Sequence, residues 1–175
     1  MPRDSKGDSA SPRSQAAFAF RETDRQSRHP ARRPATPVTV YVDTSVLLRL
    51  VLREPEALDD LRSYDALVSS ELTAVESART IDRLRLQGGL TTDEAAARVR
   101  AVNQWLEAFD LVLVRRPVLS RASEPMPLPL GMLDAIHLAT ALIWRDRIGP
   151  ISTMATHDSA LGIAARAFGF EVRGV

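Results

Sequence analysis

Apolar positions along the chain follow two spacings, which predicts alternating strands and helices. Short runs rich in β-branched residues predict strands at 38–42, 66–69, 111–114, 151–154 and 170–172. Segments with apolar residues three or four apart, bounded by capping residues, Gly or Pro, predict helices at 46–52, 55–62, 70–87, 92–109, 117–123, 132–145 and 158–168. This order of elements is typical of an α/β sandwich built on a mainly parallel sheet.

The pattern begins only at residue 38. Residues 1–37 carry eight basic and four acidic residues, hold five of the 11 prolines and contain few large apolar side chains. Such a segment cannot bury enough surface to offset its chain entropy, so we expect a disordered leader before one domain at 38–175. Two interpretations stay open: a basic arm that attracts nucleic acid, or a solvated extension that includes a start assigned too early. A truncation beginning near Val38 distinguishes them.

Composition removes several classes of protein. The absence of Cys excludes disulfide scaffolds, Cys-ligated zinc and thiol catalysis. No apolar run reaches the ~20 residues of a membrane helix, and no secretory signal is present, so we expect a cytoplasmic protein. The only Lys is Lys6, in the leader, which argues against P-loop NTPases and HAD-type phosphatases. The phosphatases also need an Asp where this chain has Ser45.

Four acidic residues lie where predicted strands give way to helices. Asp43 ends the first strand, and Asp158 follows the fourth. Glu76 lies about two turns into the helix after the second strand, and Asp134 lies in the first turn of the helix at 132–145. Ligands of parallel α/β sheets bind outside the carboxyl ends of the strands, so these four positions are candidates for one site.

Each acid also has an ordinary structural role available. Asp43 and Asp158 can cap helices, Glu76 can pair with Arg79 on its own helix, and Asp134 can complement the helix dipole. Asp134 and Glu76, however, border the apolar stripes of their helices, and a carboxylate at the edge of a core needs a partner. The predicted domain contains no Lys, so a hard divalent cation is the group that would satisfy several acids together.

Four segments of the chain together resemble the PIN-domain ribonucleases, and most closely the VapC toxins of bacterial toxin–antitoxin pairs. These segments are 40–45, 69–76, 133–141 and 156–158. The similarity runs in order through 38–175, and the stretch from Asp134 to Ala141 is its most specific part. The resemblance implies a PIN-like three-layer sandwich, with a mainly parallel central sheet flanked by helices. The chain departs from the family where Gly131 and Met132 precede Leu133, since members often carry Arg or a small polar residue there. This departure leaves the RNA contacts beside the site undefined.

The resemblance also implies a set of site residues. The metal-binding acids of the family correspond to Asp43, Glu76, Asp134 and Asp158, and the supporting hydroxyls to Thr44 and Thr156. The implied activity is a Mg²⁺- or Mn²⁺-dependent endoribonuclease that hydrolyses RNA phosphodiester bonds and leaves 5′-phosphate and 3′-hydroxyl ends. The metal would polarise the phosphate and activate water. The implied partners are the RNA substrate, a cognate antitoxin that holds the enzyme inactive, and a second copy in a homodimer.

Two other functions remain open within the resemblance. One is a PIN nuclease of RNA processing that has no antitoxin, and the other is a non-catalytic PIN-like domain that binds RNA or a partner. The presence of all four acids favours catalysis. The arginines that could hold RNA are Arg79, Arg83, Arg115 and Arg116, and all of them also fit as solvated surface. His137 and His157 are expected to be core residues rather than RNA contacts, and the helix at 46–52, apolar nearly all round, could pack in the core, on an antitoxin or on a second copy.

Overall fold

The computed structural model describes residues 38–175, and the predicted leader lies outside the described residues. Within them the strands are β1 (Thr39–Val42), β2 (Ala66–Ser70), β3 (Phe109–Val112), β4 (Thr153–Ala155) and β5 (Glu171–Arg173). The helices are α1 (Thr44–Leu52), α2 (Leu72–Leu86), α3 (Thr92–Leu106), α4 (Arg116–Ala122), α5 (Met132–Arg147) and α6 (Ser159–Ala167). A short 3₁₀ helix, η1 (Asp59–Ser63), precedes β2.

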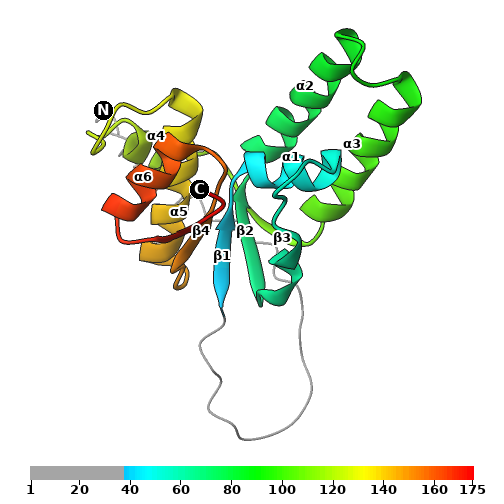
Figure 1. The fold of residues 1–175 in the computed structure, drawn as a ribbon. Coiled ribbons are helices and arrows are strands. Elements are labelled where there is room, and N and C mark those ends of the chain that lie inside the picture. Colours follow the sequence, from blue (N-terminus) through cyan, green and yellow to red (C-terminus); the bar gives the residue numbers. More distant parts are fainter. Residues whose placement is uncertain (1–37) are drawn as a thin grey trace, which may run out of the picture. The chain divides into compact units, whose positions relative to one another are not determined.

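The five strands form one sheet in the order β3-β2-β1-β4-β5, and every pair is parallel. From β1 the chain builds one side of the sheet through β2 and β3, and later the other side through β4 and β5. The carboxyl end of β1 is therefore a switch point, where ligands of such sheets bind. Helices α4, α5 and α6 lie on one face and α1, α2 and α3 on the other (Figure 1), which confirms the predicted three-layer sandwich.

Side chains of the central strand alternate between two cores. Val40 and Val42 pack with apolar residues of α1 and α3, whereas Tyr41 packs with residues of α5 and α6. All of β1 is buried, because helices cover both faces of the sheet. This double covering explains the continuous apolar run at the start of the domain, and it gives the following residue, Asp43, a fixed base.

Three sequence predictions need correction. The helix predicted at 55–62 is the shorter η1, because Arg53 and Glu56 adopt left-handed backbone conformations that break the helix after α1. The helix predicted to reach Phe109 ends at Leu106, and Phe109 instead begins β3. The strand predicted at 111–114 is β3, shifted by two residues, because its pairing with β2 starts at Phe109 and ends at Val112.

Helices α2 and α3 form a hairpin that extends past the carboxyl edge of the sheet (Figure 1). Gly88 permits the turn through a positive φ of 77°, a conformation that costs little for Gly. Thr91 and Glu94 then start α3 with a capping box, in which each side chain accepts the other residue's backbone N–H. No helix within residues 38–175 is both long and apolar enough to cross a membrane.

Candidate functional site

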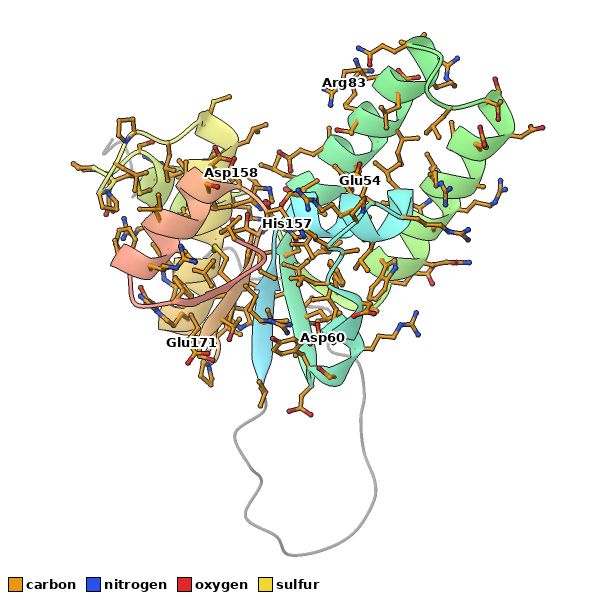
Figure 2. The ribbon with its side chains drawn as sticks, viewed as in Figure 1. Glu54, Asp60, Arg83, His157, Asp158 and Glu171 are labelled. Carbon is orange, nitrogen blue, oxygen red and sulfur yellow. The ribbon has the colours of Figure 1, made fainter. Side chains whose placement is uncertain are left out.

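The site lies at the carboxyl edge of the sheet, where β1, β2 and β4 end beside one another. Asp43 follows β1, and Thr156 to Asp158 follow β4. Figure 2 shows His157 and Asp158 at this end of the sheet and Asp60 and Glu171 at the opposite end. The parallel register thus brings residues more than 100 positions apart in sequence to one place.

Asp43 is held by three hydrogen bonds to a single carboxylate oxygen. It is 5% exposed and caps α1. Its Oδ2 accepts the backbone N–H of Ser45 (3.2 Å), the hydroxyl of Ser45 (2.5 Å) and the hydroxyl of Thr156 (3.0 Å). Because the donors converge on Oδ2, Oδ1 remains available, 3.7 Å from Nε2 of His137. Ser45 also accepts the backbone N–H of His157 (2.9 Å), which ties the loops after β1 and β4 together.

Glu76 reaches this edge from α2. Its Oε2 lies 2.8 Å from Nε2 of His137 and accepts the hydroxyl of Thr44. Burial by itself would raise the pKa of Glu76, but the hydrogen bonds from His137 and Thr44 outweigh it and hold the pKa below its ordinary value. The carboxylate is therefore stabilised in its ionised form.

A row of buried hydroxyls anchors α2 beneath Glu76. Ser69 donates to the backbone carbonyl of Val42 (2.7 Å) and is hydrogen-bonded to Thr73 (2.7 Å). The hydroxyl of Thr73 lies 3.2 Å from that of Thr44. Since Thr73 is in the first turn of α2, this row fixes the helix, and with it Glu76, to the end of the central strand.

Asp134 and Asp158 lie on the other side of the site. Asp134, in the first turn of α5, is half-buried. Burial raises its pKa, and the negative charges of Asp158 and Asp43 raise it further. Asp158 caps α6 through Oδ1, which accepts the backbone N–H of Leu161 (2.8 Å), and its own N–H donates to the hydroxyl of Thr156 (3.0 Å). Asp43 and Asp158 are therefore helix caps, and the negative charge of each also acts on Asp134.

The four predicted acids lie at one edge but do not form a closed cage. Among residues 38–175, no three His, Asp or Glu side chains are grouped closely enough to hold a metal ion as they stand. Asp43 and Glu76 are linked through His137, whereas Asp134 is coupled to the others only through charge. Glu76 does not pair with Arg79, which instead contacts Asp82 (3.4 Å).

The donor set nevertheless fits a hard divalent cation. The predicted ligands are carboxylates, and no Arg of the described domain forms an ion pair with Asp134. Burial and the surrounding negative charges raise the pKa of Asp134, and the nearby His137 offsets them only in part. Mg²⁺ prefers carboxylate oxygens and keeps several of its waters, so it does not require a closed cage of side chains.

Sequence reasoning missed the part played by His137. It was expected to be a satisfied core residue, and it is 1% exposed with both ring nitrogens hydrogen-bonded. One of these partners, however, is the candidate site residue Glu76. The available signal was its position three residues after Asp134, one turn along the same helix face. Ser45 was also missed, because a Ser in the first turn of a helix has no distinctive pattern.

The fold and this edge of acids define a PIN-type domain, and the comparisons agree. The family model of the PIN domain matches residues 40–148, which include Asp43, Glu76 and Asp134. Ribonuclease VapC46 of Mycobacterium tuberculosis strain H37Rv is 33% identical over 138 residues, covering 76% of this chain and 95% of that protein. Ribonuclease VapC47 of Mycobacterium tuberculosis strain CDC 1551 is 29% identical over 132 residues, covering 75% of this chain and 93% of that protein.

The chain belongs to the PIN-domain family, in the group of VapC-type ribonucleases. Among solved structures, VapBC2 of Rickettsia felis, crystallised with a DNA fragment from its promoter, matches with a TM-score of 0.55 and 10% identity. That match covers 78% of this chain and 98% of the other chain, and it shows a shared fold. The match of the family model ends before Asp158, so the role of this acid depends on its position in the structure.

Proposed function

We propose that the protein is a metal-dependent endoribonuclease, the cytoplasmic toxin of a VapBC-type toxin–antitoxin pair. The observation that carries the proposal is the position of the four acids at the carboxyl edge of the sheet in a VapC-type domain, where Asp134 forms no ion pair with an Arg of residues 38–175. A partly buried carboxylate surrounded by other acids is typical of a site that binds a cation.

The proposed ligands of Mg²⁺ or Mn²⁺ are Asp43, Glu76, Asp134 and Asp158, directly or through water. When bound, the ion would polarise the scissile phosphate and lower the pKa of a water molecule. The protein supplies orientation. Ser45 and Thr156 hold one oxygen of Asp43 and leave the other available, and Thr44 holds Glu76. Attack by water on the phosphorus gives the 5′-phosphate and 3′-hydroxyl products that we expect.

Glu76 has a second role within this proposal. Its carboxylate is kept ionised by hydrogen bonds, so at neutral pH it can accept a hydrogen bond from a water molecule and orient it beside the phosphate. Asp134 and Asp158 make fewer hydrogen bonds, and this leaves their oxygens available as ligands. The arginines proposed to contact the RNA backbone are Arg79 and Arg83 on α2 and Arg115 and Arg116 at the start of α4.

The proposed protein partners are a cognate antitoxin and a second copy of the chain. Large apolar side chains near the site are exposed, including Val75 (59%) on α2 and Met132 (76%) on α5, and such groups suit a protein interface. Helix α1 gives weaker support, because Leu48 and Leu50 pack against the core and so account for much of its apolar surface.

The test is cleavage of RNA by the purified protein with Mg²⁺ and with EDTA. We expect cleavage only with the metal, loss of cleavage in Asp134→Asn, and full activity in the matched control Asp146→Asn. Asp146 lies on the same helix, 60% exposed, with its carboxylate near Arg145. Equal cleavage by the wild type and Asp134→Asn would overturn the site. RNA binding without cleavage would indicate the non-catalytic alternative.

The toxin assignment needs a separate experiment. Co-expression with the protein encoded directly upstream should suppress both cleavage and growth arrest, and the two proteins should purify as a complex. An active nuclease that no neighbouring gene product inhibits would instead support a PIN nuclease of RNA processing.

A further inference from the structure

His137 connects the centre of the sheet to the candidate site through both nitrogens of its ring. Nδ1 lies 2.8 Å from the hydroxyl of Tyr41, and Nε2 lies 2.8 Å from Oε2 of Glu76. Tyr41 is fully buried in β1 and His137 is 1% exposed. We infer that His137, oriented by Tyr41, is a positioning residue that fixes the carboxylate of Glu76 for the proposed reaction. This inference rests on the proposed function.

The hydrogen bonds determine where the ring proton lies. An ionised carboxylate has no proton to donate, so in the 2.8 Å contact Nε2 of His137 must be the donor to Oε2 of Glu76. With a neutral ring, Tyr41 donates to Nδ1, and the ring proton must then be on Nε2, which donates to Glu76. With a charged ring, Nδ1 donates to the phenol oxygen and Nε2 still donates to Glu76. The contact with the carboxylate is therefore the same in both protonation states.

The same arrangement gives His137 a defined place in the site. An Nε2 that carries a proton has no lone pair for a metal, so His137 acts through Glu76 and is not a ligand itself. Nε2 also lies 3.3 Å from the hydroxyl oxygen of Thr44 and 3.7 Å from Oδ1 of Asp43. One N–H thus lies between buried Asp43 and half-buried Glu76, separates their charges and sets the direction of the Glu76 carboxylate.

The ring is held firmly enough to do this. Its plane stands at 74° to that of Tyr41, with the ring centroids 6.0 Å apart, in an edge-on contact. His137 lies on the buried face of α5, and Tyr41 lies on the buried strand β1. A shift of Glu76 would therefore break a partly buried, charge-assisted hydrogen bond, which costs more than loss of a neutral one.

The first test compares His137→Gln with His137→Asn. The amide nitrogen of Gln can take the position of Nε2 and donate to Glu76, whereas that of Asn is too short and reaches only the position of Nδ1. We expect His137→Asn to lower cleavage by about 10–100-fold, as loss of supporting contacts around metal sites does, and His137→Gln to restore most of it. The same order is expected in the Mg²⁺ concentration that gives half of the metal-induced rise in Tm. Equal losses in two variants that fold as stably as each other would overturn the inference.

The second test does not depend on activity. The ¹⁵N chemical shifts of His137 in the wild-type protein report which nitrogen carries the proton. We expect the neutral ring to carry its proton on Nε2. Tyr41→Phe should weaken this preference and give a mixture of the two neutral forms. An unprotonated Nε2 in the wild type would overturn the inference even if RNA is cleaved, and a protonated Nε2 in a protein that cuts no RNA would overturn only the proposed function.

Discussion

The two sides of the site hold their acids by different interactions. One side contains Asp43 and Glu76, and the other contains Asp134 and Asp158. Asp43 and Glu76 receive side-chain hydrogen bonds from buried or half-buried partners, including His137. Asp158 receives a backbone hydrogen bond as a helix cap, and Asp134 is coupled to the acids mainly by repulsion. We call these pairs the bonded half and the charged half. Side-chain donors hold both carboxylates of the bonded half, whereas in the charged half Asp158 is held as a helix cap and Asp134 has no side-chain donor among the hydrogen bonds described above.

The pKa of Glu76, in the bonded half, and that of Asp134, in the charged half, move in opposite directions for this reason. Burial acts against ionisation of both Glu76 and Asp134. Hydrogen bonds from His137 and Thr44 reverse its effect on Glu76, and nearby negative charges add to its effect on Asp134. Burial therefore does not decide the state of a carboxylate in this site. The decisive factor is whether the adjacent groups are donors or other acids.

The largest expected effect is on RNA cleavage, which substitutions in both halves should lower, whereas only the substitution in the bonded half should also lower the stability of the fold. Asp43→Ala and Asp134→Ala should each lower RNA cleavage by about 10²–10³-fold, since each removes a proposed ligand worth several kcal/mol at the transition state. Asp43→Ala should also lower the free energy of unfolding by about 1–3 kcal/mol, because it removes a helix cap and leaves buried donors unpaired. Asp134→Ala should change it by less than about 1 kcal/mol, because the lost interaction with the helix dipole is offset by relief of repulsion.

Cleavage assays and urea denaturation without metal measure these two effects. Asp146→Ala, on the exposed face of α5, is the control for both. Equal losses of stability in the Asp43 and Asp134 variants would remove the distinction between the halves.

The next effect concerns Thr156, which joins them. Its buried hydroxyl donates to Asp43 and accepts the backbone N–H of Asp158. Thr156→Val keeps the shape of the side chain but removes both hydrogen bonds, so we expect cleavage to fall by about 10–100-fold and the half-maximal Mg²⁺ concentration to rise. Thr156→Ser restores the hydroxyl and should recover most of the activity. Failure of Ser to recover it would show that the methyl group of Thr156, and not its hydroxyl, matters.

Much of this comparison could be predicted from sequence, because it depends on local signals. The strand at the start of the domain, the cap at Asp43 and the apolar stripe of α5 are visible in the order of residues alone. The sequence also identifies the four acids as candidates, because each lies at the end of a strand or in the first turns of a helix. Errors occurred where the structure depends on longer-range pairing. The start of β3 is set by its neighbour β2, and left-handed conformations at Arg53 and Glu56 end a helix that the spacing predicted.

The contacts of His137 could not be predicted in the same way. Tyr41 and His137 are 96 residues apart in sequence, and His137 and Glu76 are 61 apart. The packing of α5 against β1 brings His137 to Tyr41, and the hydroxyls that anchor α2 to the end of β1 bring Glu76 to His137. A sequence pattern reports that His137 lies on the buried face of its helix, but it does not report what is opposite. The distinction between the bonded and charged halves therefore required the structure.

A smaller effect is expected at Gly131, directly before α5. A Cβ at this position would lie 2.9 Å from Oδ2 of Asp134, too close for the carboxylate to stay where it is. The backbone there, with φ of −59° and ψ of 155°, is open to any residue. Gly131→Ala should therefore stabilise the fold by about 0.4–1 kcal/mol through the unfolded state. It should nevertheless lower cleavage several-fold by moving Asp134. Gly149→Ala, whose nearest contact is 3.9 Å away, is the control.

The smallest effect is the pH dependence of stability in EDTA, and it has opposite signs for Asp134 and Glu76. The folded-state pKa of Asp134 is raised, so its contribution is greatest at low pH and is lost as the pH rises from its ordinary value of 3.8. Relative to Asp134→Asn, the wild type should become less stable over that rise. The folded-state pKa of Glu76 is lowered, so its contribution is present above its ordinary value of 4.5 and is lost as the pH falls below it. Relative to Glu76→Gln, the wild type should lose stability on acidification. Urea denaturation of the three proteins across this range measures both differences, and differences of the same sign would show that burial alone governs the two acids.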